Sequence, residues 1–157
     1  MAEELQTIDM NVIMLSDARE ALFKIENFIK AQVDSIKVEL PVTNHFAKDV
    51  YGRELFIPEG TLLSGKIHKH SSLNMLLKGK LILITEDGRQ ELEAPYVIAS
   101  KPGIKRVIYA LSDCTWVTCH GTDLTDVDAI EAKFIAKDYS EVEYLDEQIE
   151  QKKLLKE

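Results

Sequence analysis

The sequence predicts a mainly β domain, a small barrel or sandwich, with helical segments at both ends. Many short apolar segments between residues 42 and 120 are separated by turn-forming residues, which is typical of such folds. Apolar residues recur at helical spacing before and after this region. We therefore divide the chain into an N-terminal helical segment (1–40), a β-barrel (41–122) and an acidic C-terminal helical extension (123–157).

The first predicted element is a helix over residues 16–37. Ser16 is positioned to cap it, and Glu20 lies near its first turn. Its apolar stripe predicts a face that covers a core or an oligomer interface, and consists of Ala18, Leu22, Ile25, Phe28, Ile29, Val33 and Ile36. Pro41 ends this region.

Eight short strands follow. We expect them at residues 42–48, 53–57, 62–69, 73–84, 89–93, 95–99, 105–110 and 114–120. The breaks between them have turn chemistry, and consist of Tyr51-Gly52, Pro58-Glu59-Gly60, Asp87-Gly88, Pro102-Gly103 and Ser112-Asp113. The clearest hairpin is predicted around Asp87-Gly88, between 80–84 and 89–93.

Helical patterning returns after Gly121. The segments 125–128 and 140–143 both resemble capping boxes, and the second precedes an apolar stripe over 142–154. Residues 123–157 contain eleven acids and five bases, a net charge of −6 out of −8 for the chain. This extension is either a solvated acidic appendage or an element that docks a partner.

Composition excludes several classes of function. The net charge of −8 argues against a nucleic-acid backbone or an anionic membrane as partner. The acidic N-terminus and the lack of a long apolar run predict a soluble, cytoplasmic protein. Cys114 and Cys119, five residues apart in one predicted strand, face opposite sides and cannot pair with each other. We interpret them as small apolar residues in a reducing compartment.

Two histidines at i and i+2, His68 and His70, share one face if their segment is a strand. Paired imidazoles can ligate a metal or hold an anion. The glycines around this pair are Gly65 and Gly79, and a second segment, 95–106, contains Pro102-Gly103. With these motifs, residues 52–120 resemble the cupin family, whose fold is a double-stranded β-barrel of jelly-roll type. Small cupin-like proteins also occur in bacteria and bacteriophages.

The departures from the family pattern concern the metal site. No carboxylate stands between Ser71 and Asn74, where the family has an acid, and Arg106 stands where it has a third histidine. The resemblance implies a metal such as Fe, Ni, Mn or Zn, yet two imidazoles are too few for a tight site. His120, which shares a strand face with Trp116 and Thr118, could complete it. His45 is a further candidate, and both could equally be polar residues near a barrel rim.

Arg106 suggests a different chemistry, because a guanidinium is a permanent cation with paired donors. With His68, His70 and Asn74 nearby, such a pocket suits a carboxylate or phosphate. Alternatively, Arg106 turns outward, and the strand register decides between the two.

Three functions remain open. The first is a non-enzymatic binder that sequesters an anionic or nucleotide-like metabolite or signal through His68, His70, Asn74 and Arg106. The second is a metal-dependent isomerase or dioxygenase that uses His68 and His70, with His120 as a third ligand. The third is a structural scaffold whose end helices make the contacts. For each we expect a homodimer or a higher homo-oligomer.

Overall fold

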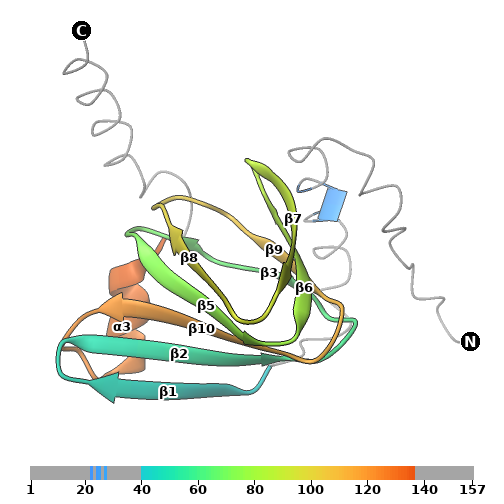
Figure 1. Cartoon of the computed structure of the whole chain (residues 1–157). Helices are drawn as coiled ribbons and strands as arrows, with labels where there is room; N and C mark the ends of the chain where they lie inside the picture. The colour runs from blue at the N-terminus through green and yellow to red at the C-terminus, as the bar shows by residue number, and fades with distance from the viewer. Residues whose placement is uncertain (1–21, 23, 26, 28–39, 137–157) are drawn as a thin grey trace, which may run out of the picture.

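The computed structural model describes residues 22, 24, 25 and 27 and the continuous stretch 40–136. Two antiparallel sheets form the body of the domain (Figure 1). In spatial order, the five-stranded sheet consists of β1 (Val42–Ala47), β2 (Val50–Ile57), β10 (Cys114–Gly121), β5 (Ser72–Lys78) and β8 (Tyr96–Ser100). The four-stranded sheet consists of β3 (Leu62–Ser64), β9 (Val107–Ala110), β6 (Lys80–Thr85) and β7 (Gly88–Glu93).

A short segment closes one end of these sheets. Helix α3 (Val127–Phe134) lies behind the ends of β2 and β10 in Figure 1 and leads directly into β11 (Ile135–Ala136). Strand β11 pairs with β4 (Ile67–His68) as a separate two-stranded sheet. The predicted fold class, a mainly β barrel of jelly-roll type with helix at the C-terminal side, is confirmed.

The alternation of side chains along β6 separates an inner core from an outer one. Leu81 and Leu83 belong to the cluster between the sheets, whereas Ile82 and Ile84 face outward. The outward pair packs with Leu22 and Ile25 of the predicted N-terminal helix. The four described residues of 16–37 are helical, as predicted, and the others lie outside the described residues.

The first hairpin differs from the prediction. The turn lies at Lys48–Asp49 rather than at Tyr51-Gly52, and β2 therefore starts at Val50. Asp49 has a φ of 61°, a left-handed conformation that Asp tolerates in turns. Tyr51 and Gly52 are consequently paired strand residues.

Two predicted strands are each divided in two. The predicted strand 62–69 is broken at Gly65, whose N–H donates to the carbonyl of Arg106 at 2.8 Å, so that β3 and β4 join different sheets. The predicted strand 73–84 is broken at Gly79, which has a φ of 92°. The chain passes there from the five-stranded to the four-stranded sheet, a change of direction typical of glycine at barrel corners.

The remaining boundaries lie close to the prediction. The hairpin of β6 and β7 is confirmed, with Thr85 opposite Gly88. Helix α3 starts one residue later than the predicted capping box, because Asp126 is the N-cap and its carboxylate accepts from the N–H of Ala129 at 3.2 Å. The predicted helix after Ser140 lies outside the described residues. Within the described part of the chain, no helix has the length and hydropathy needed to cross a membrane.

Candidate functional site

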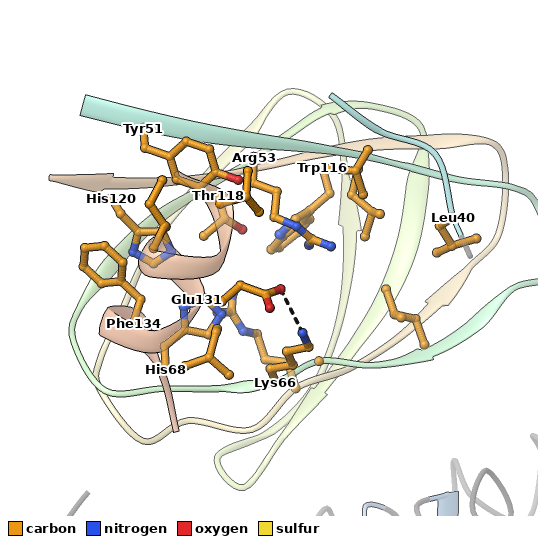
Figure 2. Close-up of a pocket in the computed structure, with 18 of the residues that line it drawn as sticks. Leu40, Tyr51, Arg53, Lys66, His68, Trp116, Thr118, His120, Glu131 and Phe134 are labelled. Carbon is orange, nitrogen blue, oxygen red and sulfur yellow. Dashed lines mark hydrogen bonds and ion pairs between the residues drawn. The ribbon is translucent and has the colours of Figure 1, made fainter. Parts of the chain in front are cut away.

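A cavity of about 660 Å³ lies between the two sheets, beside helix α3. Figure 2 shows side chains from both sheets and from α3 surrounding it. The side chains that line it include Arg53, Leu63, Lys66, His68, Arg106, Ile108, Trp116, Thr118, His120, Glu131 and Phe134. Its volume is within the range typical of small-molecule sites.

Arg106 is the buried cation of this cavity. It lies immediately before β9 and points to the same side as Ile108, two residues further on, which packs in the inner core. Its side chain is buried, and its guanidinium carbon lies 5.9 Å from the centroid of the Trp116 ring. Its Nη1 has no hydrogen-bond partner among the described residues. Burial lowers the pKa of Arg106, but an arginine stays charged at physiological pH.

Two imidazoles and a phenyl ring form a stack beside Arg106. The ring centroids of His68 and His120 are 5.1 Å apart at an interplanar angle of 17°. Those of His120 and Phe134 are 4.3 Å apart at 22°. The Nδ1 atoms of His68 and His120 are both buried and without a hydrogen-bond partner in the described part of the chain. Each of them can therefore accept or donate a hydrogen bond to a bound molecule.

The environment of the stack keeps both imidazoles neutral at physiological pH. Burial, then the neighbouring His120, then the positive charge of Arg106 lower the pKa of His68 to about 4. Arg53 and Lys66 act on it in the same direction. For His120, burial, then His70 and Arg106, lower the pKa to about 4. Burial and His120 are thus joined by three cations, Arg106, Arg53 and Lys66, in lowering the pKa of His68.

The charges that line the cavity are unbalanced. Three cations, Arg53, Lys66 and Arg106, and one carboxylate, that of Glu131, line the cavity. The lining therefore carries a net charge of +2 when both imidazoles are neutral. Lys66 and Glu131 pair at 3.1 Å on the exposed side of the cavity, as the dashed line in Figure 2 marks. In a chain with a net charge of −8, this cavity is locally positive.

His70 does not share the cavity with His68, so the prediction that both rings face one cavity is wrong. Strand β4 ends at His68, and the chain bends at Lys69 and His70. The period-2 rule therefore does not extend to His70. His70 is exposed and contacts Phe134 edge-on, with ring centroids 5.7 Å apart.

Asn74 lies beside the cavity but does not line it. It is fully buried, and its Nδ2 donates to the hydroxyls of Ser100 at 2.7 Å and Ser72 at 3.2 Å. Its Oδ1 accepts from the hydroxyl of Thr118 at 2.8 Å. Both amide donors are thus used within the protein, and Asn74 holds Thr118, which does line the cavity. His45 is exposed on β1, where it pairs with Glu54 at 3.6 Å.

The sequence reasoning missed Arg53, Lys66 and Glu131. Arg53 alternates with Tyr51 and Leu55 on the inward face of β2, a pattern that the sequence contains but that depended on where β2 starts. Glu131 reaches the cavity because β11 pairs with β4, and no local sequence pattern predicts that pairing. His120 shares its inward strand face with Trp116 and Thr118, as expected.

The described residues do not fit the metal that the fold resemblance implies. Among them, no three His, Cys, Asp or Glu side chains are grouped closely enough to hold a metal ion. The imidazoles in the cavity, His68 and His120, are stacked, and the carboxylate of Glu131 is paired with Lys66. The buried guanidinium of Arg106 would also repel a dication.

Comparison with solved structures identifies the architecture. The chain superposes on ectoine synthase from P. lautus with a TM-score of 0.51 and 14% sequence identity, covering 64% of this chain and 77% of that one. The chain has the cupin fold. KdgF from Halomonas sp. is also similar, with a TM-score of 0.48 and 12% identity, over 58% of this chain and 86% of that one.

A further similar structure is an RmlC-like cupin family protein from Methanocaldococcus jannaschii. Its TM-score is 0.45 at 13% identity, over 57% of this chain and 85% of that one. No protein-family model matches the sequence, and the search of curated proteins gives no match. At 14% identity the likeness to ectoine synthase establishes the fold alone.

Proposed function

We propose that this protein binds a small organic anion in the cavity, with Arg106 as the principal contact to the negative group. The observation that carries the proposal is a buried guanidinium with an unpartnered Nη1 beside a cavity. A buried charge without a partner is costly, and an anion would offset that cost through charge-assisted hydrogen bonds. Arg53 and the two unpartnered Nδ1 atoms of His68 and His120 support binding from neighbouring positions.

The test is binding of defined anions by the full chain, followed calorimetrically with sodium hexanoate, inorganic phosphate and adenosine monophosphate. Arg106→Ala is expected to raise the Kd of any anion that binds by at least ~30-fold, from a loss of at least about 2 kcal/mol. Arg89→Ala removes an exposed arginine on β7, outside the cavity, and is the matched control. Equal loss in both variants, or none in either, contradicts the role of Arg106.

The second candidate is the metal-dependent isomerase or dioxygenase. The specific observation in its favour is a pair of neutral imidazoles in the cavity, although they belong to His68 and His120 rather than His68 and His70. Chelator treatment is expected to change anion binding little. Stoichiometric Fe, Ni, Mn or Zn in protein purified without a metal-affinity tag, with an activity lost to chelator, would make the enzyme the better interpretation.

We also propose that the protein acts as a homodimer in the cytoplasm, where it sequesters its ligand. Both cysteines are free, in keeping with a reducing compartment. Outward side chains of β5, β8 and β10 offer a second copy an apolar surface.

A further inference from the structure

The cavity is much larger than an anionic head group. Its volume of about 660 Å³ compares with roughly 30 Å³ for a water molecule in the liquid. The side chains that line the remaining space are mainly aliphatic, and consist of Leu40, Val42, Leu55, Leu63, Ile108, Val127, Ile130 and Ile135. In Figure 2, Leu40 lies across the cavity from the His120 and Phe134 rings, with Arg53 between them.

This aliphatic wall begins next to Arg106. Ile108 follows Arg106 on the same strand face, about 7 Å along the strand. Leu63 on β3 is the cross-strand partner of Ile108, so their side chains share that face. On the facing sheet, Leu55 and its cross-strand partner Val42 line the same cavity. A molecule whose negative group contacts Arg106 therefore meets aliphatic side chains on both sides.

We propose, on the basis of the function proposed above, that the ligand is a carboxylate with an aliphatic body. The carboxylate contacts Arg106, and the body lies between Leu63 and Ile108 on one side and Leu55 on the other. One carboxylate matches the one buried guanidinium, whose Nη1 has no partner among the described residues, because Lys66 is already paired with Glu131 and Arg53 is exposed at the cavity. A nucleotide fits less well, since its base and sugar would place donors and acceptors against side chains that cannot pair with them.

The experiment is a chain-length series on the full protein, with acetate, butyrate, hexanoate and octanoate measured by calorimetry. The Kd is expected to fall about fourfold for each added methylene, because burying one CH₂ contributes about 0.8 kcal/mol. The fall should stop once the chain fills the space beside the aliphatic side chains. 1-Hexanol, which lacks the charge, is expected to bind at least ~30-fold more weakly than hexanoate. Adenosine monophosphate and inorganic phosphate complete the panel.

A pair of adjacent leucines supplies matched variants. Leu63 lines the cavity, whereas Leu62 faces the opposite side of β3 and packs with the outer cluster. Leu63→Ala is expected to weaken octanoate about tenfold and leave acetate unchanged. Leu62→Ala removes the same number of atoms from the same strand and is expected to leave both Kd values unchanged.

The outcomes separate this inference from the proposed function. Equal affinity along the series, or tighter binding of adenosine monophosphate than of octanoate, overturns the aliphatic carboxylate and leaves anion binding in place. Failure of every anion in the panel, or hexanol binding as tightly as hexanoate, overturns anion binding itself. The series is measured on the parent chain, so its result does not depend on whether a variant folds.

Discussion

His68 and His120 are neutral because folding removes them from water and surrounds them with positive groups. The pKa of each lies at about 4, against an ordinary value of 6.5. Between these two values the unfolded chain binds more protons than the folded chain. Stability therefore rises with pH across this interval and is lost as the pH falls from 6.5 towards 4. The stability lost across this interval is on the order of several kcal/mol for the two imidazoles together, at roughly 1.4 kcal/mol per pKa unit for each.

We predict that the urea midpoint of the parent chain falls as the pH is lowered from 6.5 to 4.5, and that the double variant His68→Asn, His120→Asn has a flatter profile. The quantity compared is the slope of the urea midpoint against pH, because a loss of stability that is equal at every pH does not change this slope. His45→Gln removes an exposed imidazole outside the cavity and is the control. A parent chain whose midpoint does not move in this interval contradicts the neutral, buried stack.

Asn74 supports the site without contacting a ligand. Asn74→Ala leaves the hydroxyl of Thr118 without its acceptor in a buried position, and the expected loss of stability is about 2 kcal/mol. Chemical denaturation measures this. Arg106→Ala should instead lose binding while keeping stability, because Arg106 has an unsatisfied donor in the free protein. If Asn74→Ala instead lost binding while keeping its stability, Asn74 would be a ligand contact.

At the scale of the elements, local patterns predicted the strands well and their divisions badly. The hairpin of β6 and β7 depends on neighbouring residues and matches the prediction. The divisions at Gly65 and Gly79 depend on tertiary structure. The N–H of Gly65 donates to the carbonyl of Arg106, and the Asp113 carbonyl lies where a Cβ on Gly79 would stand. The same reason explains the site. The inward positions of Arg106 and His120 follow from strand alternation. His70 lies outside the cavity because β4, which pairs with β11, already ends at His68.

Gly79 is the position where a side chain should cost most. It has a φ of 92°, and an added Cβ would collide with the carbonyl of Asp113 and lie 2.8 Å from the Cys114 sulfur. We predict that Gly79→Ala destabilises the protein by at least about 2 kcal/mol, from backbone strain together with overpacking. Gly121→Ala is the control, because no atom lies within 4 Å of its added Cβ. Equal denaturation midpoints for the two variants would contradict the corner role of Gly79.

At the scale of the whole molecule, the two sheets differ in what covers their outer faces. Leu22 and Ile25 pack on the outer face of the four-stranded sheet. On the five-stranded sheet, cross-strand partners place apolar side chains of three adjacent strands on the outer face. The paired residues are Leu73, Met75, Val97, Ala99, Val117 and Cys119. Leu77, which is exposed and follows the fully buried Leu76 at a register shift, belongs to the same face. We call this set the outer apolar face. Glu54 and Lys78 lie at its margins.

We propose a second copy of the chain as the occupant of this face. Each copy carries a net charge of −8, so contact through a charged surface would bring like charges together. The outer apolar face has an uncharged centre, and two such faces can pack as the sheets of a sandwich do, about a two-fold axis. Leu77 and Val97, at 52% and 60% exposure, would lose apolar surface to water in the process.

We predict a dimer at micromolar concentration by light scattering, and a monomer for Leu77→Lys with Val97→Lys, because both copies would then bury like charges. Gln90→Lys adds a charge on β7, away from this face, and should remain dimeric. Cys119 provides an independent readout, since it lies within the outer apolar face as a free thiol. A thiol reagent should modify it faster in the monomeric variant than in the parent. A monomeric parent whose Cys119 reacts slowly would instead indicate that a segment of its own chain covers the face. A monomeric parent whose Cys119 reacts fast would show that the face is exposed to solvent, and would contradict the dimer.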